Sequence, residues 1–161
     1  MSHIKNKTIF NLILLFSIVA LLSAYLIQYV LGHKPCNLCL IERIPYFLTI
    51  IIITLSFIFK KYEKIYLISL ALIFTAASLI SFYHFGIEQG FIKESLVCDL
   101  NSPNTELSKE ALLNQLKEVP ISCKDVTFKI FGLSLATFNI FISLILSAIT
   151  TKLFLTYEKN K

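Results

Sequence analysis

The segment IFNLILLFSIVALLSAYLIQYVL, residues 9–31, decides the class of fold to which this chain belongs. It has no charged residue over 23 positions, and only Asn11, Gln28 and two serines interrupt its apolar and tyrosine side chains. At about 1.5 Å per residue, a helix of this length crosses a bilayer core of about 30 Å. Because the segment is too long for the apolar core of a signal peptide and no clear cleavage site follows it, we interpret it as a retained signal-anchor.

Three further apolar segments follow along the chain. They cover about 41–59, 65–87 and 131–152, and each supplies roughly the 20 apolar residues that a membrane crossing needs. Since backbone groups in lipid find no other hydrogen-bond partners, all four segments are expected to be helices. The sequence therefore predicts an all-α membrane protein, a four-helix transmembrane bundle in a single integral membrane domain (1–161), with outer loops over about 32–40 and 88–128.

The composition of the whole chain agrees with this class. Hydrophobic residues make up 56% of the 161 positions and charged residues 16%, against about a quarter charged in an ordinary soluble domain. The mean hydropathy is +0.74. These values exclude a soluble globular enzyme, a disordered tail and a nucleic-acid-binding module. Nucleic acid is not an expected partner despite the pI of about 9.0, because the basic residues have no continuous face to occupy.

The distribution of lysines predicts the orientation in the membrane. Four crossings place both termini and the turn at 60–64 on one side, which carries eight lysines against two acidic residues. The other side carries seven basic residues against eight acidic ones. Because cytoplasmic loops carry the excess of positive charge, both termini are expected in the cytoplasm. The outer side of a bacterial inner membrane, where disulfides persist, then holds all four cysteines: Cys36, Cys39, Cys98 and Cys123.

The first two cysteines form a C-x-x-C pair before the second apolar segment. A disulfide between Cys36 and Cys39 closes so short a loop that it stabilises little, and redox exchange or half of a metal site is the usual role. The N-terminus of the following helix favours a thiolate at Cys39. Arg43 is the one arginine of the sequence, which has fourteen lysines. It follows Cys39 by four residues and shares its helix face. It could hold that thiolate or polarise an oxygen acceptor; the alternative is an interfacial cation paired with Glu42.

The second cysteine pair brackets a polar outer segment. A disulfide between Cys98 and Cys123 closes a loop of 26 residues, worth about 3 kcal/mol in the loop-entropy model, so a structural disulfide is one interpretation. Two dithiols on one membrane side favour instead a relay that passes a disulfide between them. A zinc site of four cysteines is the least favoured, because structural zinc prefers two closely spaced pairs, and no metal is expected. Residues 107–119 have the spacing of a short amphipathic helix, lying on the membrane or packed on the domain.

Two ionisable residues mark the outer end of the third apolar segment. His84 and Glu88 are four positions apart and share a helix face. Ionisable groups at a membrane boundary are candidates for handling protons. The alternative is a pair of interfacial polar residues exposed to water.

Three stretches of this chain resemble the DsbB family of disulfide bond formation proteins. The run KPCNLCLIERIPY (34–46) resembles the C-x-x-C segment of that family. The run HFGIE (84–88) followed by Cys98 resembles the beginning of its second periplasmic loop, and FGLSLA (131–136) with Asn139 resembles the start of its fourth helix. The resemblance covers essentially the whole chain.

The resemblance implies an enzyme, a protein-dithiol:quinone oxidoreductase of the bacterial inner membrane. Such a protein reoxidises a periplasmic DsbA-like thiol oxidase and passes the electrons to the quinone pool, as ubiquinone or menaquinone. Carried onto this sequence, Cys98 exchanges with the cysteine of the partner and Cys123 is its disulfide mate. Cys36 and Cys39 then regenerate that second pair.

The resemblance also implies where the quinone cofactor lies. Cys39 becomes the thiolate beside the quinone ring, Arg43 assists there, and His84 and Glu88 are further cofactor-binding candidates. Three alternative functions remain: a paralogue that serves a different dithiol partner, a carrier that moves reducing equivalents outward, and a non-enzymatic four-helix scaffold with two structural disulfides. The second is disfavoured because reductive carriers place reactive cysteines in the membrane or toward the cytoplasm.

Overall fold

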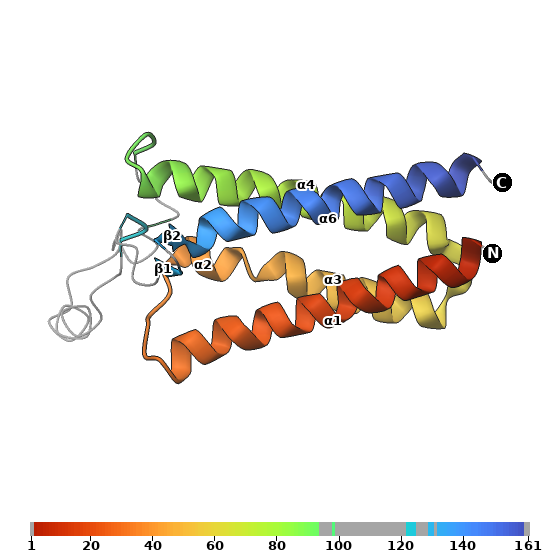
Figure 1. Ribbon diagram of the computed structural model, residues 1–161, viewed down its shortest axis with the longest axis horizontal. Coiled ribbons are helices and arrows are strands. Elements are labelled where there is room, and N and C mark those ends of the chain that lie inside the picture. The colour runs from red at the N-terminus through yellow and green to blue at the C-terminus, as the bar shows by residue number, and fades with distance from the viewer. Residues whose placement is uncertain (1, 94–97, 99–121, 125–128, 131, 160–161) are drawn as a thin grey trace, which may run out of the picture.

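Four long helices lie side by side in the structure, a computed structural model that describes residues 2–93, 98, 122–124, 129–130 and 132–159 (Figure 1). They are α1 (Ser2–Tyr29), α3 (Ile44–Ile58), α4 (Glu63–Glu88) and α6 (Leu135–Lys159). The other described elements are the short helix α2 (Asn37–Ile41), the 3₁₀ turn η1 (Lys60–Tyr62) and the strands β1 (Lys129–Ile130) and β2 (Leu133–Ser134).

The described residues contain four spans that are long and apolar enough to cross a membrane. They are Lys7–Tyr29, Asn37–Ile58, Glu63–Glu88 and Leu135–Tyr157. The predicted all-α bundle of four transmembrane helices is therefore confirmed, and the protein is a multi-pass membrane protein. Large apolar side chains on the outer surface of the bundle suit contact with lipid, which is as apolar as leucine itself.

The core of the bundle lies where α3 and α4 meet α1 and α6. α4 packs most extensively against α6, and α3 contacts both α1 and α4. Ile53, Leu67, Leu70 and Phe74 are fully buried there. Both termini lie at one end of the bundle, whereas α2 and the two strands lie at the opposite end (Figure 1).

The start of the fourth helix differs from the predicted 131–152. Lys129–Ile130 pairs with Leu133–Ser134 as an antiparallel hairpin, and α6 begins only at Leu135. Gly132 takes a φ of 81° at the turn, a conformation that glycine adopts without steric cost. The Ser134 hydroxyl then accepts a hydrogen bond from the N–H of Thr137 at 3.3 Å, which caps the first turn of α6.

The second span also differs from the predicted 41–59. It begins earlier, because α2 starts at Asn37 directly after Cys36, and it is interrupted at Glu42 and Arg43 before α3 starts at Ile44. Pro45 lies at the first turn of α3, where no intrahelical N–H bond is lost. Cys36 therefore caps the helical span and Cys39 lies inside its first turn, rather than both preceding it. The predicted helix at 107–119 lies outside the described residues.

Directly after α4 the chain turns back toward the end of that helix. Gly90 has a φ of 77°, and the N–H groups of Phe91 and Ile92 donate to the carbonyl of Gly86 at 2.9 and 3.1 Å. A Cβ on Gly86 would lie 2.6 Å from Cδ1 of Ile92, so a side chain at this position would require Ile92 to move. Ile92 thus lies beside Gly86, which is between His84 and Glu88 in the sequence.

Candidate functional site

The C-x-x-C pair forms the N-terminus of α2. Cys36 is the N-cap residue, and its Sγ accepts a hydrogen bond from the backbone N–H of Cys39 at 3.3 Å. The two sulfur atoms are 2.8 Å apart. Cys36 is buried and Cys39 is half-buried. Both sulfurs thus lie at the end of a helix whose free N–H groups favour negative charge.

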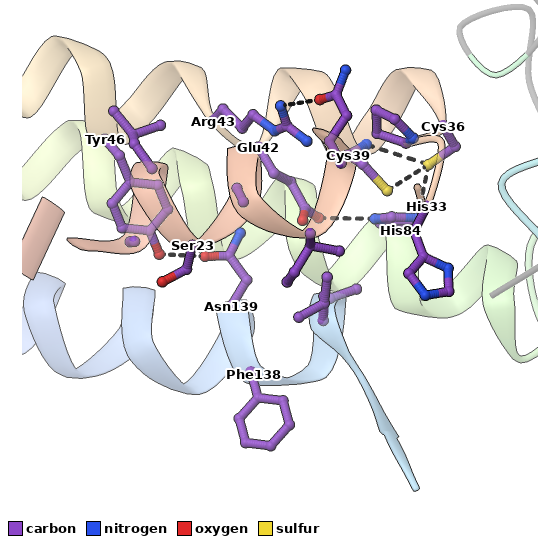
Figure 2. A pocket seen from close by; sticks show the side chains of 18 of the residues that line it. Ser23, His33, Cys36, Cys39, Glu42, Arg43, Tyr46, His84, Phe138 and Asn139 are labelled. Atoms are coloured by element: carbon purple, nitrogen blue, oxygen red, sulfur yellow. Dashed lines mark hydrogen bonds and ion pairs between the residues drawn. The ribbon is translucent and has the colours of Figure 1, made fainter. Parts of the chain in front are cut away.

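His84 reaches this pair from α4 and connects it to a buried carboxylate. Its Nε2 is 3.5 Å from Sγ of Cys36, and its Nδ1 is 3.0 Å from Oε1 of Glu42 (Figure 2). His84 is 2% exposed and Glu42 8%. When the Nδ1–H group of the neutral ring donates a hydrogen bond to the carboxylate, Nε2 presents a lone pair to the thiol. Cys36, His84 and Glu42 therefore form a continuous thiol–imidazole–carboxylate chain.

Glu88 lies next to this chain without completing it. Its Oε1 is 3.7 Å from Nε2 of His84, longer than a normal hydrogen bond. Its Oε2 is buried and has no hydrogen-bond partner within the described parts of the chain. The structure thus brings the predicted pair His84 and Glu88 to the C-x-x-C pair, but the closer carboxylate belongs to Glu42.

The environment of Cys36 keeps its thiol protonated. The hydrogen bond with Cys39 raises the pKa of Cys36 far above the ordinary thiol value, burial raises it further, and His84 opposes part of this shift. Cys36 therefore keeps its proton through the neutral pH range.

Arg43 makes contacts that the sequence did not indicate. Its Nη1 donates to Oε1 of Gln28 at 2.6 Å, and its guanidinium carbon lies 5.1 Å from the ring centre of Tyr25. Both partners belong to α1, so the cation fastens the junction of α2 and α3 to that helix. The alternative in which Glu42 binds Arg43 is not realised, because that carboxylate contacts His84.

A cavity of about 400 Å³ opens beside these residues. Its polar end holds Cys36, Cys39, Arg43 and the carboxylates, and apolar side chains of α1 and α6 line the remainder. The predicted site residues on its wall are Cys36, Cys39, Arg43, His84, Glu88 and Cys123. A flat apolar molecule with a polar group at one edge would match this lining.

The second cysteine pair packs directly behind the first. Cys98 and Cys123 are 4% and 2% exposed, and they form one buried cluster with Cys36, Leu38 and Ile87. Burial raises the pKa of Cys123, and a hydrogen bond with Cys98 raises it further. All four cysteines are free thiols in this structure. The two dithiols thus lie together at the end of the bundle remote from the termini, although Cys98 is not on the cavity wall.

A second polar group lies deeper along the same cavity. The hydroxyl of Tyr46 donates to Oδ1 of Asn139, and Nδ2 of Asn139 donates to Oγ of Ser81 at 2.7 Å. These bonds join α3, α6 and α4, and Tyr46 and Asn139 line the cavity. Sequence reasoning quoted Asn139 only as part of a motif.

Glu42 is the functional candidate that sequence reasoning missed. It was considered only as a partner of Arg43, yet it supports His84 at the centre of the site. One signal was available: Glu42 is an acidic residue within an apolar span, three residues after Cys39, and such residues mark functional positions by default. The sequence does not reveal how α4 is rotated about its axis, and this rotation places His84 opposite Glu42.

The fold and the site define a multi-pass membrane protein with two dithiols gathered at one end of a four-helix bundle. The chain matches the family described as "Disulfide bond formation protein DsbB" over residues 6–153, and it belongs to that family. It is 31% identical over 156 residues to "Uncharacterized protein RP370" of Rickettsia prowazekii (strain Madrid E), across 94% of this chain and 90% of that protein. No solved structure matches it. The protein is thus a disulfide bond formation membrane protein.

Proposed function

We propose that this protein is a dithiol:quinone oxidoreductase that reoxidises a periplasmic DsbA-like thiol oxidase. The observation that carries the proposal is the position of the C-x-x-C pair. On one side it borders an apolar cavity between membrane-spanning helices, and on the other it packs against Cys98 and Cys123. Membership of the DsbB family supports the disulfide-forming part of the proposal.

The electrons move by two exchange reactions between thiols. A partner thiolate attacks the Cys98–Cys123 disulfide, and resolution of the mixed disulfide leaves the partner oxidised and both cysteines reduced. The second pair then passes two electrons to a Cys36–Cys39 disulfide by the same chemistry. The packing of all four cysteines in one cluster supports this transfer, because a mixed disulfide requires the sulfur atoms to meet.

The residues of the cavity fit a quinone. Its apolar walls suit a lipid-soluble ring, and Arg43 offers a permanent cation at the edge where Cys39 lies. A bound quinone supplies the two-electron acceptor that net disulfide formation needs. We assign Cys39 as the sulfur that meets the acceptor, since it lines the cavity and Cys36 keeps its proton.

His84 and Glu42 handle the proton of Cys36. When the Cys36–Cys39 disulfide is formed again, Cys36 loses its proton, and Nε2 of His84 is 3.5 Å from its sulfur. Glu42 at 3.0 Å holds the ring in orientation and stabilises the charged imidazole that results. The dyad thus acts as a general base for the buried thiol.

The site faces the periplasm and both termini face the cytoplasm in this proposal. The excess of lysines at the termini and at 60–64 supports that orientation. α2, which Cys36 caps and which contains Cys39, lies at the end of the bundle opposite the termini (Figure 1), as this orientation requires.

The decisive experiment follows quinone reduction by the purified protein with a reduced DsbA-like dithiol as electron donor. Loss of quinone absorbance is expected for the native chain and is abolished in Cys39→Ser. Normal turnover in Cys39→Ser would refute the mechanism. The scaffold alternative predicts a different pattern, in which single serine replacements leave disulfide formation at the cell surface intact and both cysteine pairs resist mild reductant.

A further inference from the structure

We propose that the reduced C-x-x-C pair and His84 form a binding site for Zn²⁺ that is present only in the reduced protein. Sγ of Cys36, Sγ of Cys39 and a ring nitrogen of His84 all lie within 4.8 Å of one another. They come from two separate elements, α2 with its N-cap and α4. Thiolate sulfur and imidazole nitrogen are the ligands that zinc prefers.

The spacing of the ligand atoms matches a zinc centre closely at one edge. Zinc bonds of about 2.3 Å to sulfur and about 2.0 Å to nitrogen place those two atoms about 3.5 Å apart in a tetrahedron. Sγ of Cys36 and Nε2 of His84 are 3.5 Å apart. The two sulfurs, now 2.8 Å apart, would have to separate to about 3.8 Å. Cys39 is half-buried and has room for that rotation.

Glu42 prepares His84 as a ligand. Metal-binding histidines commonly donate their second ring N–H to a carboxylate, which fixes the tautomer and raises the basicity of the ligating nitrogen. Nδ1 of His84 contacts Oε1 of Glu42 at 3.0 Å, and Nε2 is directed toward Cys36. The carboxylate–histidine arrangement of zinc sites is thus already assembled.

Glu88 is the candidate for the fourth ligand, because its buried carboxylate lies beside His84. Its side chain is 5% exposed and its Oε1 is 3.7 Å from Nε2 of His84. Its Oε2 is a buried acceptor with no hydrogen-bond partner among the described residues. Glu88 lies outside the group of three ligand atoms within 4.8 Å of one another, so its carboxylate has to move toward them to complete the four-coordinate shell that zinc takes.

Binding involves no electron transfer. The zinc ion forms two bonds to sulfur and one to nitrogen, and the two thiols release two protons to solvent. Oxidation of the pair to a disulfide removes both thiolate ligands, so the oxidised protein loses the site. Resting on the proposed function, a further consequence is that bound zinc holds the pair reduced and stops electron transfer reversibly.

The test titrates Co²⁺, a spectroscopic substitute for zinc, into the reduced full-length protein in detergent, without quinone and without a histidine tag. The Cys98→Ser/Cys123→Ser background removes the other thiols. We expect sulfur-to-cobalt and tetrahedral absorption bands that Zn²⁺ abolishes, and no such bands after oxidation to the disulfide. His84→Ala and Cys39→Ser should each weaken binding at least tenfold, and Glu42→Gln about tenfold. His3→Ala is the control, because His3 lies near the N-terminus of α1, at the end of the bundle remote from the cysteines. This variant should bind Co²⁺ as tightly as its background.

Two results would overturn the site. One is a Co²⁺ affinity that is the same in His84→Ala as in its background. The other is a loss of all binding in the Cys98→Ser/Cys123→Ser background, which would place the metal on the other cysteines. Because these titrations use neither the dithiol partner nor quinone, their result tests the zinc site independently of the proposed function. Inhibition of quinone reduction by Zn²⁺, reversed by chelator, tests the consequence alone.

Discussion

Replacing Glu42 by glutamine separates the charge of this carboxylate from its shape. The amide has nearly the same volume, so the packing of α2 against α4 is kept, and its oxygen can still accept a bond from Nδ1 of His84. What is lost is a charge-assisted hydrogen bond of 3.0 Å between side chains that are 3% and 10% exposed. The imidazole that accepts the proton of Cys36 then has no neighbouring anion at this position.

The magnitude follows from the kind of bond that is replaced. A hydrogen bond to a charged group contributes about 1.5–3 kcal/mol, and a neutral bond about 0.5–1.5 kcal/mol. The difference of about 1–1.5 kcal/mol corresponds to a step that is about five- to thirteenfold slower where the imidazole is charged. We therefore expect the rate of quinone reduction by a reduced dithiol donor to fall about five- to thirteenfold in Glu42→Gln.

Glu88→Gln is the matched control for this loss. Its oxygen is 3.7 Å from Nε2 of His84 rather than 3.0 Å from Nδ1, so the same chemical change should slow the reaction less. Thermal unfolding in detergent checks that both variants are folded. An unchanged rate in Glu42→Gln, or an equal loss in both variants, would contradict the general-base role of the His84–Glu42 dyad.

Three further predictions address other parts of the site. The pKa of Cys36 is raised, so the rate at which Cys36 is alkylated in the reduced protein, measured by mass spectrometry, should rise about tenfold per pH unit through about pH 9. An ordinary thiol of pKa about 8.5 levels off there. A plateau in the Cys36 rate below about pH 8 would contradict this prediction. Arg43→Ala should weaken the use of quinone in steady-state assays and leave the mixed disulfide with the partner able to form, and unchanged quinone kinetics would refute the assigned role. Asn139→Leu removes the bonds to Tyr46 and Ser81 and should lower the free energy of unfolding in detergent by about 1–3 kcal/mol, whereas an unchanged unfolding midpoint would show that this network does not stabilise the bundle.

The fold could be predicted from hydropathy because lipid permits so few structures. An apolar segment of about 20 residues can cross lipid only as a helix, because its backbone groups must bond within the segment. All four membrane-spanning helices were therefore predicted from the sequence. The ends of the segments were less predictable. Leu133 and Ser134 are compatible with a helix, yet Gly132 turns them back on β1. The interruption at Glu42 and Arg43, by contrast, has a local cause, because Pro45 has no N–H to donate to the carbonyl of Ile41.

The site could be predicted only in fragments. Spacing along one helix related Cys39 to Arg43 and His84 to Glu88, because neighbours four apart share a face. It could not join residues of different helices, since their meeting depends on how each helix is rotated in the bundle. The contact between Glu42 and His84 spans 42 positions of sequence, and the bond from Arg43 to Gln28 spans 15.

The polar groups at the cysteine end argue for redox chemistry rather than a scaffold. Removing a carboxylate from water costs several kcal/mol even after relaxation, and the side chains of Glu42 and Glu88 are 10% and 5% exposed. A scaffold stapled by two disulfides needs the cysteines and an apolar bundle, and it gains nothing from this burial. Forming a disulfide from a buried thiol, by contrast, requires a base that can take its proton out of an apolar environment. The imidazole and carboxylate that lie in line with Cys36 meet that need, so their cost is explained by the reaction and not by the fold.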